Sequence, residues 1–104
     1  MKKAKTAKTA YEELGFPDAE RMLLKAQLVV NIHEILRERG WSQQKAARVL
    51  GLTQPNISRM LRGEFRGISE IKMMECLVRL GRAVKIIVGP ESKKPAARME
   101  VVAA

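Results

Sequence analysis

A run of hydrogen-bonding side chains between residues 54 and 62 is the part of this sequence best suited to chemistry. When the apolar residues of this run face inward, five polar side chains are left facing outward: Gln54, Asn56, Ser58, Arg59 and Arg62. Amide and guanidinium groups make paired hydrogen bonds to base edges, and hydroxyls and cations bind phosphate oxygens. The pattern therefore indicates contact with a nucleic acid rather than a covalent reaction.

The elements that must position these side chains are predicted by the segment WSQQKAARVLGLTQPNISRMLRG, residues 41–63. Ser42 is a good N-cap for a short helix over residues 43–50. Ala47 is small, as is needed where two helices cross closely. Gly51 then suits a tight turn, because glycine readily adopts the left-handed backbone conformation. The first half of the segment therefore predicts a helix that ends in a sharp turn.

A second helix is predicted over residues 54–62. Thr53 caps it, and Pro55 lies in its first turn, where a missing N–H group costs nothing. Five apolar side chains of the segment are expected to face inward: Leu50, Leu52, Ile57, Met60 and Leu61. Two short helices joined by a three-residue turn with glycine form the helix-turn-helix unit that reads DNA. An ordinary helical hairpin with a polar surface is the alternative, but the agreement of caps, turn and polar face favours the DNA-reading unit.

The charge of the chain points to a polyanionic partner. Its 104 residues are enough for one small domain, and 20 basic against 11 acidic residues give a formal charge of +9. Residues 1–10 contribute +4 and residues 41–66 another +4. An anionic membrane surface would also fit this charge, but its coincidence with the helical pair favours nucleic acid. RNA is disfavoured, because the chain has only one Trp, one Tyr and two Phe to stack on bases.

An enzyme is not expected. His33 and Cys76 are the only histidine and cysteine, which cannot build a zinc site without outside ligands, and there is no glycine-rich phosphate loop. We therefore predict no catalytic residue, no metal and no cofactor, with His33 structural and Cys76 a buried thiol. A single cysteine excludes an intramolecular disulfide and indicates a reducing compartment. With no apolar run near the ~18 residues of a membrane span and no secretion signal, we expect a cytoplasmic protein without membrane contact.

The chain is predicted to have three parts. Residues 1–17 form a flexible basic N-terminal arm, residues 18–90 the folded domain, and residues 91–104 a mobile tail. Three side chains of the arm could dock on the domain: Tyr11, Leu14 and Phe16.

Two further helices complete the predicted domain. A helix capped by Asp18 and running to about residue 39 has seven apolar side chains at helical spacing: Met22, Leu24, Leu28, Val29, Ile32, Ile35 and Leu36. A helix over residues 70–80, capped by Ser69, is expected to turn four side chains to the core: Ile71, Met74, Leu77 and Val78. Trp41 is also predicted to lie in the core.

Residues 83–88, AVKIIV, have the β-branched composition of a strand. A lone strand in a helical domain has no partner in its own chain, so it is expected to pair with the same strand of a second copy. The side chains assigned to this dimer contact are Val84, Ile86, Ile87 and Val88. The fold prediction is therefore all-α, with one short C-terminal β-strand that pairs across a homodimer. The alternative is a strand that folds back on residues 11–16.

The segment resembles the helix-turn-helix of the XRE (Cro/C1-type) regulators at four positions: Gln43, Ala47, Gly51 and Ile57. The resemblance extends over about residues 11–90. A long capped helix ending in RERGWSQQKAA, then LGLTQPNISRMLRG, then LGRAVKIIVGP are similar to the small HigA-type antitoxins of toxin–antitoxin pairs.

The XRE resemblance implies a lambda-repressor-like fold and a role for each matching position. Gln43 would contact a phosphate and support the following helix, residues 54–56 would enter the major groove first, and Arg59 would reach a guanine or the backbone. Ser58 and Arg62 would contact phosphates. The full set of expected DNA-binding residues is Gln43, Lys45, Thr53, Gln54, Pro55, Asn56, Ser58, Arg59 and Arg62.

The antitoxin resemblance implies two activities in one protein. A homodimer would bind a palindromic double-stranded operator and repress its own operon, and the same protein would neutralise a small RNase toxin. Because toxins of this group are basic, the acidic and apolar residues 11–24 are the candidate contact, with Tyr11, Leu14 and Phe16 as its apolar side chains. The alternative is an autonomous, phage-type repressor with no toxin partner.

Overall fold

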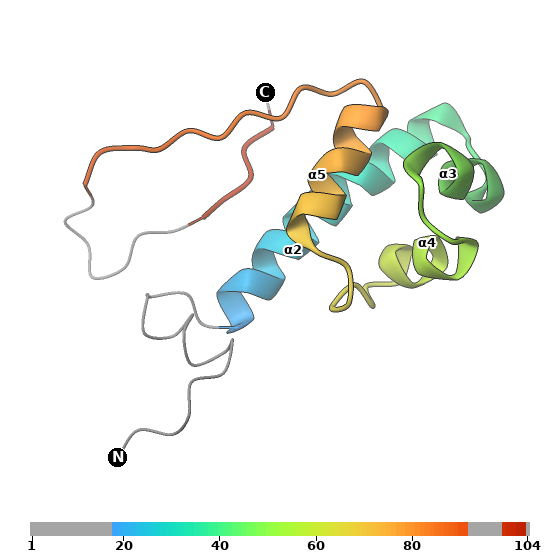
Figure 1. Ribbon diagram of the computed structural model, residues 1–104, viewed down its shortest axis with the longest axis horizontal. Coiled ribbons are helices and arrows are strands. Elements are labelled where there is room, and N and C mark those ends of the chain that lie inside the picture. Colours follow the sequence, from blue (N-terminus) through green and yellow to red (C-terminus); the bar gives the residue numbers. More distant parts are fainter. Residues whose placement is uncertain (1–17, 92–98, 104) are drawn as a thin grey trace, which may run out of the picture.

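The computed structural model describes residues 18–91 and 99–103 and contains four helices in these ranges (Figure 1). They are α2 (Asp18–Arg39), α3 (Gln43–Leu50), α4 (Gln54–Leu61) and α5 (Glu70–Arg79). Each predicted helix is therefore confirmed, with two C-terminal ends one residue shorter than expected and with Asp18, the predicted cap, as the first residue of α2. α5 packs along α2, and α3 and α4 lie together beside that pair.

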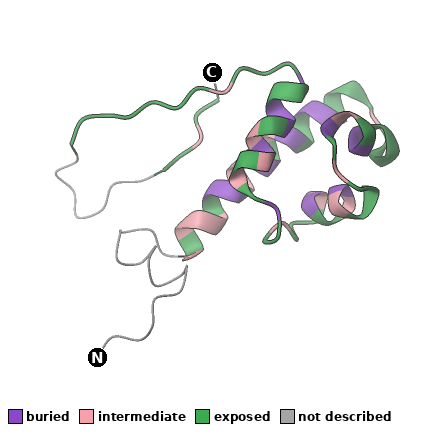
Figure 2. Ribbon diagram, in the orientation of Figure 1, coloured by how far each residue is buried: buried purple, intermediate pink, exposed green. Residues whose placement is uncertain are grey.

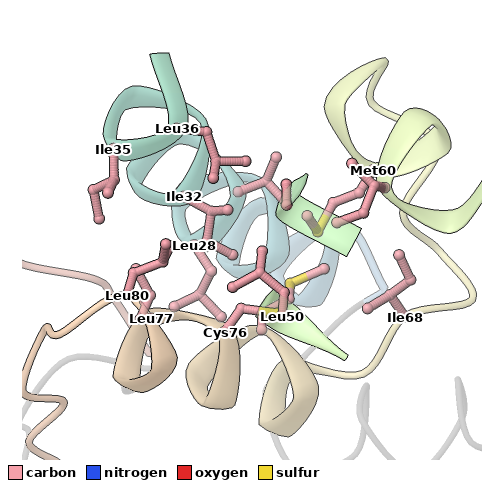
Figure 3. Close-up of a cluster of buried hydrophobic side chains, with 14 of the residues drawn as sticks. Leu28, Ile32, Ile35, Leu36, Leu50, Met60, Ile68, Cys76, Leu77 and Leu80 are labelled. Atoms are coloured by element: carbon pink, nitrogen blue, oxygen red, sulfur yellow. The ribbon is translucent and has the colours of Figure 1, made fainter. Parts of the chain in front are cut away.

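The core lies where the four helices meet (Figure 3). Six of the seven apolar side chains predicted for α2 are buried there, and Met22 is half-buried. The largest side chains that are fully buried come from α2, α3, α4, α5 and its C-cap: Ile32, Leu50, Ile57, Met60, Met73, Cys76 and Leu80. Since each such side chain contributes about 1.5–3 kcal/mol by leaving water, this shared core is what holds α3 and α4 against α2 and α5.

The buried face of α5 differs from the prediction. Ile71 and Val78, expected in the core, are 62% and 58% exposed, whereas Met73 and Cys76 are completely buried. Apolar residues lie around most of this helix, so helical periodicity alone does not select one face. Only Leu77, of the four predicted core side chains of α5, is fully in place, and Met74 is half-buried against the core.

Hydroxyl caps begin three of the helices, as the sequence predicts. The side-chain oxygens of Ser42, Thr53 and Ser69 each accept a hydrogen bond from the backbone N–H of the third residue of the helix that follows. The distances are 3.1 Å for α3, 3.2 Å for α4 and 3.1 Å for α5. Each bond satisfies a donor that the helix itself leaves unpaired, which stabilises the helix by about 1 kcal/mol. The start of α4, and therefore the register of its outward side chains, is fixed by Thr53.

The turn between α3 and α4 is held from outside by α5. Gly51 has φ +70°, in the left-handed region that glycine adopts without strain. The guanidinium of Arg79 lies over this turn and donates to the carbonyl of Val49 at 3.3 Å. A Cβ atom at Gly51 would stand 2.8 Å from Nη1 of Arg79. The turn therefore favours glycine for its backbone angle, and a Cβ atom there would also displace the end of the flexible Arg79 side chain.

A polar cluster joins the first half of α2 to the loop after α4. Lys25, which is 3% exposed, donates from Nζ to the carbonyl of Arg66 at 2.8 Å. Arg21 pairs with Glu70 at 2.8 Å, and Arg66 pairs with Asp18 at 3.1 Å. These contacts fix the connection between α4 and α5 to α2.

The predicted β-strand is absent from the described part of the chain. Residues 82–89 run without strand or helix, and Ile86, Ile87 and Val88 are 78%, 86% and 91% exposed (Figure 2). A strand is defined by hydrogen bonds to a neighbour, and no other described segment pairs with this one, so the strand prediction is wrong for the single chain. Val84 alone packs partly against the core. The alternative partner, residues 11–16, lies outside the described residues.

The end of the chain returns to α2. The backbone N–H of Val101 donates to Oε1 of Gln27 at 3.1 Å, and its side chain is half-buried against the core. Residues 99–103, which we assigned to a mobile tail, therefore contact the domain in this structure.

Candidate DNA-binding surface

α3 and α4 form the helix-turn-helix predicted from the sequence. Residues 51–53 join them, and each helix buries its apolar side: Ala46, Ala47 and Leu50 from α3, and Ile57 and Met60 from α4. Leu52 and Leu61 are half-buried against the same core. The inward set of the segment is thus confirmed, and the rest of α4 is left at the surface.

The outward side of α4 carries the predicted polar residues. Gln54, Pro55, Arg59 and Arg62 are exposed, and Asn56 and Ser58 are half-buried at the margin of that side. At the start of α3, Gln43 and Lys45 are also exposed. The structure therefore gathers the predicted residues of α3 and α4 on the accessible side of one helix pair.

Hydrogen bonds along α4 and its C-cap arrange the outward side chains before any ligand arrives. Nη1 of Arg59 donates to Oδ1 of Asn56 at 3.0 Å, and Nη1 of Arg62 donates to the hydroxyl of Ser58. Among the described residues, the amide NH2 of Asn56 has no partner, so it stays available as a donor. Because Asn and Arg recognise bases through such planar donor groups, this pair can present one combined pattern to a base edge.

The helix pair is basic and has no acidic side chain of its own. Lys45, Arg48 and Arg59 lie on α3 and α4, and Arg62 is the C-cap of α4. Glu64, which follows the pair in the sequence, forms an ion pair with Arg62 at 3.4 Å, and both side chains are more than half exposed. A surface with this balance attracts phosphates, which supply most of the affinity of DNA-binding proteins.

Trp41 lies at the junction of α2 and α3 and differs from its predicted role. It packs partly against the core, but two cations also stand over its ring: Nζ of Lys45 at 4.6 Å and Cζ of Arg39 at 5.2 Å from the centroid. A groove of about 260 Å³ opens beside it. Sequence reasoning missed this cluster, although an aromatic residue four positions before a lysine at a helix start is a spacing that brings the two together.

The other predicted residues lie apart from this surface. Cys76 is buried in the core (Figure 3), where burial raises the pKa of its thiol and keeps it protonated, while His33 is exposed on α2. The candidate toxin contacts Tyr11, Leu14 and Phe16 lie outside the described residues. None of the described helices is long and apolar enough to cross a membrane.

Comparison with known proteins agrees with this geometry. A helix-turn-helix domain family matches residues 10–89 of the chain. The chain belongs to that family. A solved structure provisionally described as an XRE family transcriptional regulator is 32% identical, with a TM-score of 0.78 over 85% of this chain and 100% of the other. No protein with a curated function matches the sequence.

This helix-turn-helix protein is accordingly a DNA-binding transcriptional regulator of the XRE family. The XRE resemblance and the all-α fold are confirmed, and regulators of this family are typically not enzymes. Neither description names an antitoxin or a dimer.

Proposed function

We propose that this regulator binds a palindromic operator as a homodimer, places α4 of each copy in the major groove and blocks transcription of its own operon. The observation that carries the proposal is the composition of the accessible side of α4. It has side chains suited to base edges and side chains suited to phosphates, and α4 contains no carboxylate. Such a face has no evident role in packing the single chain, because the opposite side of α4 already supplies the core with Ile57 and Met60.

Within this proposal, the side chains divide by position along the helix pair. Gln54, Pro55 and Asn56 meet base edges first, and Pro55 offers only an apolar contact such as a thymine methyl group. Arg59, one turn on, reaches a guanine or the backbone. The remaining side chains of the predicted set contact the backbone: Gln43, Lys45, Thr53, Ser58 and Arg62. Base contacts determine the sequence that is bound, and phosphate contacts supply affinity.

The homodimer is supported by apolar side chains that the single chain leaves in water. Ile86, Ile87 and Val88 are almost fully exposed along an extended segment, and Ile71 and Val78 are exposed on α5. Antiparallel pairing of residues 84–88 with the same segment of a second copy would satisfy its backbone hydrogen bonds and cover part of this surface. Val84, Ile86, Ile87 and Val88 are the proposed contacts.

Selection of bound duplexes from a random library tests the proposal. We expect enrichment of an inverted repeat whose half-site centres lie about 10–10.5 base pairs apart, which matches two α4 helices ~34 Å apart on one side of the duplex. Sedimentation of the protein with the selected duplex should give two chains per duplex. Failure to enrich any sequence, or binding of one chain to an unrepeated site, would contradict the proposal.

A second candidate function is that of an antitoxin, with DNA binding as its autoregulation. Besides the sequence resemblance, two apolar side chains seven residues apart on α2 support it: Leu23 and Val30 are 51% and 54% exposed, uncovered by α3, α4 or α5. They follow the segment of residues 11–17 that carries the candidate toxin contacts. An apolar side of α2 of this kind suits a protein partner more than DNA.

Co-expression with the protein encoded beside this regulator tests that role. An antitoxin is expected to rescue cells from growth arrest by its neighbour, and the double variant Leu23→Asp, Val30→Asp should lose rescue but keep DNA binding. The matched variant Gln54→Ala, Asn56→Ala should lose operator binding but keep rescue. A harmless neighbour, or a toxic one that the regulator does not neutralise, would identify an autonomous repressor instead.

A further inference from the structure

We infer that Trp41 is a positioning residue for DNA binding: its indole ring holds the Lys45 ammonium and the Arg39 guanidinium as a two-cation phosphate site beside α3. This inference rests on the proposed DNA contact of α3 and α4. Of these three residues, sequence reasoning had assigned only Lys45 to the DNA-binding surface.

The distances are those of cation–π contacts. Nζ of Lys45 stands 4.6 Å and Cζ of Arg39 stands 5.2 Å from the centroid of the Trp41 ring. Cations within about 6 Å of an indole are attracted to its face. The two charges are therefore at most about 10 Å apart. Neither is bonded to a carboxylate within the described ranges.

The backbone at the junction of α2 and α3 holds this arrangement in place. The backbone N–H of Trp41 donates to the carbonyl of Leu36 at 3.2 Å, which ties the backbone of Trp41 to the end of α2. The Ser42 cap fixes the backbone N–H of Lys45 at 3.1 Å, and Arg39 donates from Nη2 to the carbonyl of Leu80 at 2.5 Å. The guanidinium of Arg39 is thus held by a bond of its own, and the backbones that carry Trp41 and Lys45 are fixed by the ends of two helices.

A groove of about 260 Å³ lies beside the ring. Its lining includes Arg37, Trp41 and Gln43 but neither Lys45 nor Arg39, and Gln43 is itself a proposed phosphate contact. Trp41 therefore packs partly against the core and also borders this groove.

Electrostatics gives the cluster its function. Two cations held at one ring repel each other, and a phosphate that approaches both offsets that repulsion by attraction. The aromatic ring also limits the freedom of the long Lys45 side chain, so less conformational entropy is lost when it contacts DNA. The duplex backbone is therefore the ligand that fits this site.

The salt dependence of binding to a mixed-sequence 30-base-pair duplex tests the inference, because non-specific binding depends almost entirely on phosphate contacts. Lys45→Ala should reduce the slope of log K against log salt by about 0.9, the value for one phosphate. Trp41→Leu, which removes no charge and keeps an apolar side chain, should reduce the slope by the same ~0.9. Trp41→Phe, which keeps a ring, should leave the slope unchanged.

Arg48→Ala is the matched control, because Arg48 is an exposed cation of α3 that makes no ring contact within the described residues. It should alter the slopes of the wild type and of Trp41→Leu equally, whereas Lys45→Ala should change the slope of Trp41→Leu very little. Additive effects of Trp41→Leu and Lys45→Ala would overturn the inference, as would a wild-type slope for folded Trp41→Leu.

Fluorescence of the single tryptophan gives a second measurement that needs no Trp41 variant. Addition of the duplex to the wild-type protein should change the emission of Trp41, and Lys45→Ala should abolish that change. An unchanged emission when the duplex binds would show that Trp41 lies away from the contact. If the wild type bound no duplex even at low salt, the DNA-binding function itself would be wrong.

Discussion

Gly51 shows how one residue connects the fold to the reading surface. Its φ of +70° orients α4 relative to α3, and a side chain there would have to displace the Arg79 guanidinium. Gly51→Ala should therefore destabilise the protein by about 1–2 kcal/mol from backbone strain alone, and further through displacement of Arg79. Urea unfolding measures the change.

Gly63→Ala is the matched control for this prediction. Gly63 also has a positive φ, +89°, but a Cβ atom there would meet nothing within 4 Å. Gly63→Ala should cause the backbone strain without any contact with Arg79. The difference between the free energies of unfolding of the two variants therefore measures the contribution of Arg79. If Gly51→Ala were no less stable than Gly63→Ala, Arg79 would not constrain the turn.

Glu64 should weaken DNA binding, because it occupies the guanidinium of Arg62 at 3.4 Å. An exposed ion pair of this kind is worth about 0.2–1 kcal/mol, so Glu64→Gln is expected to tighten binding to a mixed-sequence duplex by about one and a half- to fivefold. Fluorescence anisotropy measures the dissociation constants.

The control for Glu64 is Glu75→Gln, which makes the same change in net charge on α5, where Glu75 pairs with Lys72 at 3.6 Å. It should alter affinity less than Glu64→Gln does. Equal tightening by both variants would mean that only overall charge matters and that Arg62 lies away from the DNA.

Local signals made much of the site predictable. Ser42, Gly51 and Thr53 fix where α3 and α4 begin and end, and those limits determine which side chains of α4 face outward. Trp41 could not be assigned in the same way, because its position over two cations depends on where Arg39 and Lys45 are held by the ends of two helices.

At the scale of whole elements, α2 and α5 run in the same direction and are joined at both ends. Arg21 pairs with Glu70 where the two helices start, and Arg39 donates to the carbonyl of Leu80 where they end. Lys25 ties the loop between α4 and α5 to α2. Burial lowers the pKa of the Lys25 ammonium below 10.5, although the negative charge of Glu70 acts to raise it. These contacts position the helix pair that carries the reading surface.

Glu70 should make the free energy of unfolding depend on pH in the acidic range. Burial alone would raise the pKa of Glu70, but hydrogen bonds from Arg21 and the backbone, with the charges of Arg21 and Lys25, outweigh it and hold the pKa below 4.5. The contribution of Glu70 is thus complete above pH 4.5, its unfolded value, and is lost as pH falls through the lower folded value.

Urea unfolding at pH 6 and pH 3 tests this. The wild type should lose more stability between these pH values than Glu70→Gln, because the variant has no proton to take up at that position. Glu34→Gln, which removes an exposed carboxylate of α2, is the control and should resemble the wild type. Equal losses for Glu70→Gln and the wild type would contradict the role of the Arg21–Glu70 pair.

Elements were predictable where their partners are local and not where they are distant. The helix limits follow from caps and glycines, but the buried face of α5 depends on how it lies against α2, so Ile71 and Val78 were misplaced. The strand at residues 83–88 needs a neighbour to exist, and residues 18–91 and 99–103 of one chain supply none.

At the scale of the whole molecule, the exposed segment after α5 is the feature that a second copy would explain. Ile87→Asp should give a folded monomer, because the side chain is 86% exposed and contributes little to the core of one chain. Sedimentation equilibrium measures the mass, and circular dichroism the fold. A wild type that is monomeric at micromolar concentration, or an Ile87→Asp variant that stays dimeric, would rule out this interface.

The central claim is that α4 reads base sequence, and the most direct test compares variants on a selected operator and on a scrambled duplex. Asn56→Ala should weaken operator binding by about 1–3 kcal/mol and leave scrambled binding nearly unchanged, while Arg62→Ala should weaken both alike. If Asn56→Ala bound the operator as tightly as the wild type, the side of α4 assigned to the bases would be wrong.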